Sequence, residues 1–363
     1  MASPTAVDHR PGHIGGGCGR HRRRVRGRSF APRLSRPRPP APVLGPAVDV
    51  FDGDLGDPFI LPVGSGANTS YIAFGTGDWP ARVPTARSAD LKSWQEGPDA
   101  LPQLPAWSPP DPKNSLSGAP AALDTGRGFV LYVSLPEAAA RQECIAAATS
   151  PTAQGPYTVV GNGPLLCQHD IGGSIDPSVT SDRAGKLHLL WKNDGNALGL
   201  PTSIWEQELT KDGLGLAGPA HRLLTSEQSW QGGIIEEPAV IPAAKGGWWL
   251  FYSGNFFDRA EYATGLAYCP SLSGPCAEAQ PGPFLGTAQL GQQRQFAPGG
   301  LETFSDAHGK LWAVLDTWNR PPPQRPLLLL PLAPTSTHHV VLTCAGTPGH
   351  LKLGPNAPLA RRA

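Results

Sequence analysis

Carboxylates precede a proline that opens an apolar run at three places in the chain. They are Asp57, Asp176 and the pair Glu236–Glu237. Burying a carboxylate beside an apolar strand costs free energy unless a partner or a ligand binds it. Carboxylates that share one site raise each other's pKa, so one stays ionised as a base while another stays protonated as an acid. Hydrolysis of a glycosidic bond requires this division of roles.

A single Asp-Pro is more often a turn or a strand cap, so the interpretation depends on whether the positions are equivalent. An X-Pro or Pro-Gly step opens a strand-like run at Pro58, Pro120, Pro177, Pro238 and Pro298. The spacings are 62, 57, 61 and 60 residues. Self-similarity at a fixed period indicates a repeat architecture, here of five units. Three of the five unit starts carry the carboxylates.

Each unit contains an aromatic-rich strand after a glycine-containing turn, which is a hairpin signal. These strands cover 71–76, 128–134, 186–192, 248–254 and 310–318. No segment has an apolar period of 3.6 residues long enough for a major helix. The pattern predicts an all-β fold, a five-bladed β-propeller whose innermost strands line a central channel. A β-sandwich with accidental proline spacing is the alternative, and the regular intervals count against it.

The composition narrows the function classes. Thirty Lys and Arg nearly cancel 29 Asp and Glu, so nucleic acid is not an expected partner. The sequence has no run of 18 apolar residues, so it predicts no membrane-spanning helix. Residues 1–46 are basic and proline-rich without an apolar stretch, so they do not form a recognisable signal peptide. We predict a disordered arm at 1–46, the propeller at 47–320, and an irregular tail at 321–363 that could close the last blade.

Six cysteines are present, with no CxxC pair and no histidines at zinc-ligand spacing. Cys269 and Cys276 bracket a turn-like loop, and Cys144 and Cys167 could pair across one hairpin. Two disulfides would indicate an oxidising compartment, so we expect an extracellular protein. Buried reduced thiols are the alternative. The sequence predicts no cofactor and no metal ligand.

Four segments together resemble the signatures of glycoside hydrolase family 43, from Gly56 to Trp318. They are DPFIL, TARSADLKSW, GSIDPSVTSDRAGKLHLLWK and IIEEPAVIPAAKGGWWLFYSGN. The resemblance implies that Asp57 is the general base and that Asp176 orients the acid and raises its pKa. It places the general acid two positions before the proline, which selects Glu236. Glu237 is then expected to point away, on the alternate face of the strand.

The resemblance implies an inverting hydrolase of arabinose- or xylose-containing polysaccharides, with its two carboxyl groups about 6.5–9.5 Å apart. Three departures from the family pattern are Gly118 in place of a Trp, Gly300 in place of a His, and Asp316 in place of a later His. They argue against a central calcium ion.

Trp107, Asn193 and Arg294 are candidate contacts to an oligosaccharide or polysaccharide substrate. For Trp107 the alternative is a cover for the rim of the core, and for Asn193 and Arg294 it is a solvated rim position. A fructan-active relative and an inactive, carbohydrate-binding propeller remain competing functions. We expect a monomer.

Overall fold

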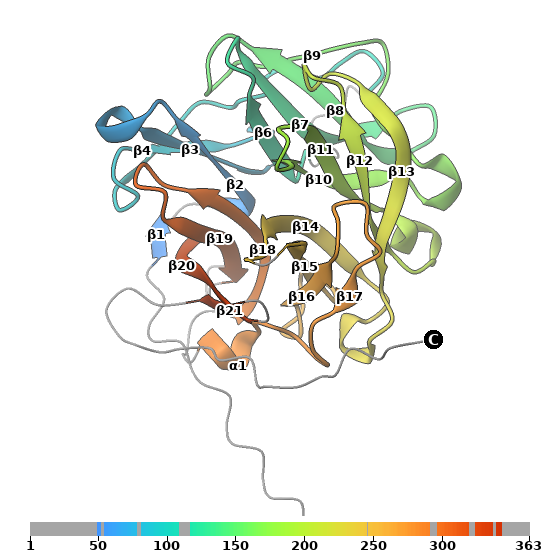
Figure 1. Cartoon of the computed structure of the whole chain (residues 1–363). Helices are drawn as coiled ribbons and strands as arrows, with labels where there is room; N and C mark the ends of the chain where they lie inside the picture. The colour runs from blue at the N-terminus through green and yellow to red at the C-terminus, as the bar shows by residue number, and fades with distance from the viewer. Residues whose placement is uncertain are drawn as a thin grey trace, which may run out of the picture. The chain divides into compact units, whose positions relative to one another are not determined.

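The computed structural model describes residues 49–51, 54–77, 81–108, 117–244, 246–290, 296–318, 324–336 and 339–342. Their strands form five antiparallel sheets arranged as the blades of a propeller (Figure 1), which confirms the predicted all-β, five-bladed fold. Helical structure among these residues is limited to α1 (Thr287–Leu290) and the 3-10 turns η1 (Gly66–Asn68), η2 (His169–Ile171), η3 (Gly195–Leu198) and η4 (Ser229–Gln231). None of these helices is long and apolar enough to cross a membrane.

Each blade runs outward from an inner strand. Blade one is β2 (Gly56–Val63), β3 (Ser70–Thr76), β4 (Thr85–Ser88) and β5 (Trp94–Glu96); blade two is β6 (Pro120–Asp124), β7 (Phe129–Glu137), β8 (Gln142–Ser150) and β9 (Thr158–Val159). Blade three is β10 (Ser174–Ser181), β11 (Leu187–Asn193), β12 (Ser203–Leu209) and β13 (Leu216–Thr225); blade four is β14 (Ile235–Pro242), β15 (Trp248–Gly254), β16 (Ala263–Cys269) and β17 (Ala277–Glu278).

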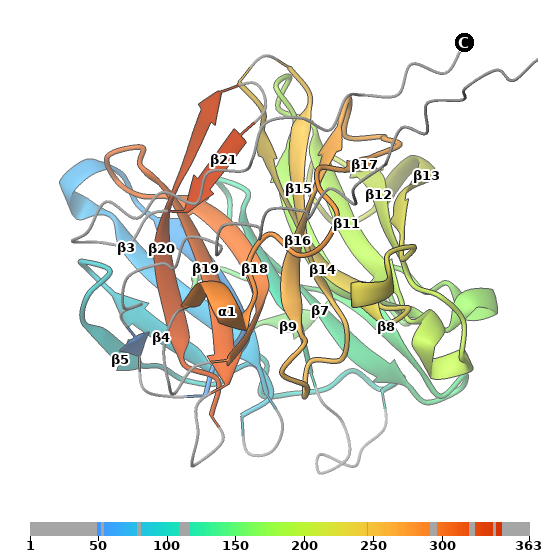
Figure 2. The same ribbon diagram turned by 90° about the horizontal axis from the view of Figure 1, so that it is seen from below.

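Blade five combines the two ends of the described chain. Its strands are β18 (Phe296–Ser305), β19 (Leu311–Trp318) and β20 (Leu327–Ser336), with β1 (Asp49–Phe51) and β21 (His339–Leu342) both paired to β20. Figure 2 shows β21 alongside β20 at the outer edge of this blade. The predicted domain boundary at residue 320 therefore falls inside blade five, because β20 continues it. The predicted arm at 1–46 lies outside the described residues.

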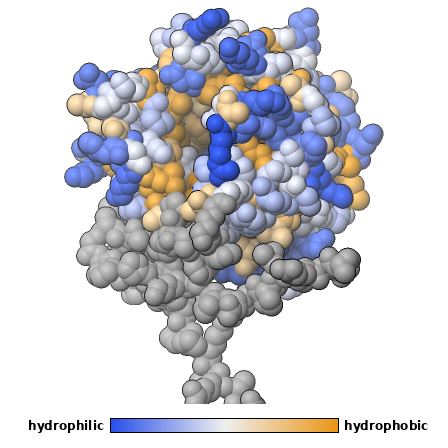
Figure 3. Space-filling view, viewed as in Figure 1, coloured by the Kyte–Doolittle hydropathy of each residue, from blue (hydrophilic) through white to orange (hydrophobic). Residues whose placement is uncertain are grey.

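The core lies between the blades, where the middle strands meet their neighbours. All seven residues of β15 are buried, so Trp248 and Trp249 belong to the core. Removing such apolar surface from water is the main force that holds adjacent blades together. In the space-filling view (Figure 3), apolar residues gather around a hollow near the centre of the face, and polar residues dominate its margin.

Four inner strands share a β-bulge at their X-Pro step, where the pairing register with the next strand shifts. The residue before the proline is left-handed in each: Asp57, Asp176, Glu237 and Ala297 have φ between 50° and 56°. Such backbone is uncommon outside glycine and often marks a functional site. A bulge also interrupts the regular alternation of side chains, so it re-aims them.

Candidate active site

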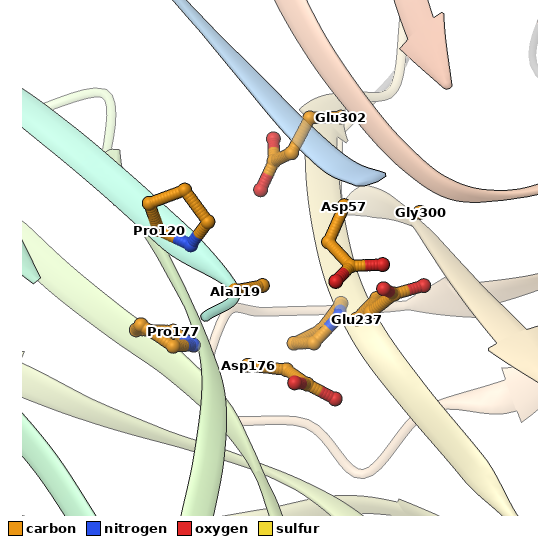
Figure 4. Close-up of a pocket in the computed structure, with 9 residues that line it drawn as sticks. Asp57, Ala119, Pro120, Asp176, Pro177, Glu237, Gly300 and Glu302 are labelled. Atoms are coloured by element: carbon orange, nitrogen blue, oxygen red, sulfur yellow. The ribbon is translucent and has the colours of Figure 1, made fainter. Parts of the chain in front are cut away.

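The inner strands meet at one pocket near the channel axis (Figure 4). Asp57 of β2, Asp176 of β10 and Glu237 of β14 line it together with Pro120 of β6 and Glu302 of β18. The free space between them is about 10 Å³, about what one water molecule occupies. A ligand larger than a water molecule therefore has to sit at the mouth of this pocket.

Asp57 is held ionised by a buried arginine. Burial raises its pKa, but the charge of Arg325 and a side-chain hydrogen bond from Glu237 outweigh that effect, so the pKa is lowered below 3.8. Arg325 Nη1 lies 3.0 Å from Asp57 Oδ1 and 3.6 Å from Asp316 Oδ2. A Cβ at position 56 would lie 1.7 Å from the guanidinium carbon of Arg325, so a larger residue there would displace this guanidinium.

Asp176 has the opposite electrostatic environment. The residue is 8% exposed, and its backbone N–H donates to Ser134 Oγ at 3.1 Å. Burial, together with the nearby carboxylates of Glu236 and Asp57, raises the pKa of Asp176 to about 8, although Lys192 opposes the shift. At neutral pH this part of the site therefore holds a proton.

Glu236 lies beside the pocket and is fixed by two donors. Lys192 Nζ donates to its Oε2 at 2.8 Å, and the Tyr262 hydroxyl lies 2.9 Å from its Oε1. Lys192 is only 2% exposed and also lies 3.7 Å from Asp194 Oδ1. Burial lowers the pKa of Lys192, but the surrounding carboxylates raise it above the ordinary value, so the ammonium stays charged.

Glu237 does not point away from the site, and the expectation from strand alternation is wrong. Its carboxyl lines the pocket, accepts from Ser253 Oγ at 2.8 Å and lies 2.7 Å from the Tyr262 hydroxyl. Because the bulge in β14 breaks the alternation, Glu236 and Glu237 both reach Tyr262. Burial and the charge of Asp57 raise the pKa of Glu237 well above 4.5.

The three predicted substrate contacts have different outcomes. Trp107 is partly buried and packs against the core of blades one and two. Asn193 is 3% exposed: its Oδ1 accepts from Ser203 N and Trp205 Nε1, and its Nδ2 donates to Ile171 O. Its amide thus links β11 to β12 and to η2, and a role in sugar binding stays a prediction. Arg294 lies outside the described residues.

Both predicted cysteine pairs are disulfides. The Cα atoms of Cys144 and Cys167 are 4.9 Å apart, and those of Cys269 and Cys276 are 4.1 Å apart. Within the described ranges, one group of metal-type ligands gathers closely, and it includes Cys144 and Cys167. These sulfurs are bonded to each other, so the group does not fit a metal ion. Position 300, where the family pattern has a histidine, offers no side chain as a ligand either.

Sequence reasoning missed Arg325, Lys192 and Tyr262. Lys192 directly follows the apolar run Leu189–Trp191 in β11, which is a signal for a buried, paired cation. Arg325 lies in the segment interpreted as an irregular tail, and Tyr262 lies in a loop that no repeat signal marks. Their roles depend on how blades three, four and five meet, which a linear pattern does not encode.

Known proteins share the family and the fold of this chain. The family model for glycosyl hydrolases family 43 matches residues 49–333. No curated protein matches the sequence.

Solved structures share the fold at low sequence identity. A thermostable family-43 glycoside hydrolase superposes with a TM-score of 0.70 at 21% identity, covering 84% of this chain and 99% of that one. An endo-1,4-beta-xylanase from Bacteroides thetaiotaomicron has a TM-score of 0.65 at 22% identity, covering 82% and 97%. An endo-arabinase from the same organism has a TM-score of 0.62 at 18% identity, covering 80% and 98%. The family model matches most of the length of this chain, so the chain belongs to glycosyl hydrolases family 43.

Proposed function

We propose that this hydrolase cleaves arabinose- or xylose-containing plant polysaccharides and oligosaccharides with inversion at the anomeric carbon. One observation carries the proposal: the site keeps one carboxylate ionised and holds a proton on another acid nearby. Arg325 lowers the pKa of Asp57 below 3.8, while the pKa of Asp176 is raised to about 8. Environments that separate the pKa values of neighbouring acids assign the base and the acid.

Asp57 is the proposed general base. It removes a proton from the water that attacks the anomeric carbon, and the space beside it is about the size of one water. The ion pair with Arg325 keeps the carboxylate ready to accept that proton across the neutral range. Every substrate needs the activated water, so this role does not depend on the leaving group.

Glu236 is the proposed general acid, acting together with Asp176. Burial raises the pKa of Asp176 to about 8, and the charge of Glu236 contributes to that shift, so a proton is held close to Glu236 at neutral pH. Lys192 and Tyr262 hold the Glu236 carboxyl in place, where it can protonate the departing oxygen. Asp176 thus orients the acid and keeps the proton available to it.

Glu237 is a second candidate for the acid because its pKa is raised. Its position argues against that role, since it hydrogen-bonds Asp57 and so lies on the side of the attacking water. An inverting mechanism needs acid and base on opposite sides of the sugar, about 6.5–9.5 Å apart. Glu237 therefore supports the base and lies too close to it to protonate the leaving group.

The substrate class rests on the family and on the named neighbours. Structures similar to this chain include those of an endo-1,4-beta-xylanase, an endo-arabinase and an alpha-L-arabinofuranosidase. Arabinose-containing chains are the first substrates to test, and xylose-containing chains come next. The proposed site of action is outside the cell, which the two disulfides support, and the proposed form is a monomer.

Hydrolysis of p-nitrophenyl α-L-arabinofuranoside and p-nitrophenyl β-D-xyloside tests the proposal directly. We expect one of them to be cleaved and the first product to be the inverted anomer by ¹H NMR. Glu236→Gln should cleave an unactivated oligosaccharide at least about a hundredfold more slowly. If the folded wild-type protein binds arabinan or xylan without cleaving any glycoside, the propeller is a carbohydrate-binding module instead.

A further inference from the structure

We propose that a groove between blades two and three binds the sugar units of the leaving group and that these units are neutral. The groove has a volume of about 530 Å³ and lies outside the axial pocket. This inference rests on the proposed function, because it assigns a direction to the substrate chain relative to the acid and the base.

The groove opens at the same end of the blades as the acids. Asp194, one of its lining residues, directly follows β11, whose last residue pairs with Ser174 at the start of β10. Asp176 lies two residues further along β10. The opposite wall is the turn between β7 and β8, which contributes Ala138 and Arg141. A chain lying at the mouth of the axial pocket can therefore continue into the groove.

The groove is connected to the proposed acid through Lys192, whereas neither Asp57 nor Arg325 lines it. Asp194 Oδ1 lies 3.7 Å from Lys192 Nζ, and the same Nζ donates to Glu236 at 2.8 Å. Asp57 is instead paired with Arg325 of blade five. In an inverting site the acid contacts the departing oxygen and the base faces the opposite side of the ring. Sugars beyond Glu236 are consequently those of the leaving group.

The walls of the groove are fixed in the free protein. The Gln142 amide bonds the backbone carbonyl of His169 at 3.0 Å and the His169 ring at 2.9 Å, which joins the β7–β8 turn to the loop before β10. The disulfide between Cys144 and Cys167 joins the same two segments. A preformed site loses less conformational entropy when it binds a ligand.

The lining chemistry suits a neutral sugar. Leu198 is 53% exposed and offers an apolar surface to the C–H face of a ring. Arg141 and Gln142 offer donors to hydroxyl groups. Three acids, Glu137, Glu143 and Asp194, line the groove against the single arginine, so an anionic sugar is disfavoured by charge.

A bulky substitution in the groove tests the inference with three substrates. Ala138→Trp places an indole on one wall, and Ala197→Trp does so on the other; both positions are exposed, so folding should be preserved. Ala184→Trp is the matched control, because Ala184 is exposed in the turn after β10, at the strand's far end from Asp176. The substrates are a nitrophenyl monoglycoside, a nitrophenyl bioside and an unmodified pentasaccharide of the sugar that the wild type cleaves.

We expect Ala138→Trp and Ala197→Trp to lower kcat/KM for the pentasaccharide about tenfold or more, because only that substrate has sugars beyond the acid. Both nitrophenyl substrates should stay within about twofold of wild type. A loss on the bioside as well would place the groove on the opposite side of the cleaved bond, and no loss on any substrate would leave it unused; either result overturns the inference. Wild-type protein inactive on all three would refute the proposed function itself, which distinguishes the two failures.

Discussion

Replacing Arg325 by methionine should make the enzyme sensitive to mild acid. The side chain is 15% exposed, and its Nη1 lies 3.0 Å from Asp57 Oδ1. The substitution removes both the charge and the hydrogen bond that keep the pKa of Asp57 below 3.8. Because the proposed base must be ionised, a higher pKa reduces activity first at low pH and leaves the neutral range less affected.

The size of the effect follows from the geometry. Two charges about 4 Å apart interact by about 4 kcal/mol at an effective dielectric constant of about 20, which is an upper limit here. An aspartate beside an arginine usually has its pKa lowered by about 1–3 units, and each unit corresponds to about 1.4 kcal/mol. Asp316 adds little repulsion, because burial raises its pKa to about 8 despite Arg325. We therefore expect the pKa of Asp57 to rise by about 2 units.

The assay is the pH dependence of kcat/KM with whichever nitrophenyl glycoside is cleaved, since this profile reports the free enzyme. At one pH unit below the midpoint of its acid limb, Arg325→Met should retain about a tenth of its plateau activity. Wild type should still be near its plateau at that pH. Arg325→Lys keeps a cation and is the control, with a smaller shift. If the acid limbs of wild type and a folded Arg325→Met coincide within about 0.3 pH unit, about 0.4 kcal/mol, Arg325 does not set the pKa of the base.

Three further outcomes are expected. Glu236→Gln should slow the hydrolysis of unactivated oligosaccharides far more than that of nitrophenyl glycosides. Glu237→Gln keeps a hydrogen-bond donor toward the proposed base, so it should lose less than about tenfold of its steady-state activity on both substrates. The reverse order would move the acid to Glu237. The double substitution Cys144→Ala and Cys167→Ala should lower the free energy of unfolding in urea by about 3 kcal/mol, and an unchanged midpoint would show that the bond does not constrain the unfolded chain. Thiol titration of unreduced, denatured protein should find no more than two of the six cysteines, and a higher count would contradict the two disulfides.

The fold was accessible from the sequence because each blade repeats a local signal. Proline at the start of each inner strand and an aromatic middle strand mark every unit, and both disulfide pairs lie close in the chain. Asp57 and Asp176 could be placed at one end of the channel because repeat-equivalent positions converge there. These predictions needed only the order of the blades.

The details of the site were not accessible in the same way. Glu237 was misplaced because strand alternation fails at a bulge, and the left-handed backbone at that residue has no signature in the side chain itself. Arg325 and Lys192 act through contacts between blades that are far apart in the sequence. Asn193 was predicted to contact sugar or to be a solvated rim residue; it is 3% exposed, and its amide bonds Ser203 and Ile171, which the sequence does not indicate.

Closure of the ring by the two ends of the chain has a consequence for biosynthesis. Strand β1 pairs with β20, Leu55 N–H donates to Arg325 O at 3.0 Å, and the same arginine sets the charge state of Asp57. A ribosome makes blade one early, so the base is synthesised about 270 residues before its partner. When only the first four blades have emerged from the ribosome, Asp57 is therefore without its counter-ion. Asp57 can pair with Arg325 only after residue 325 has left the ribosome.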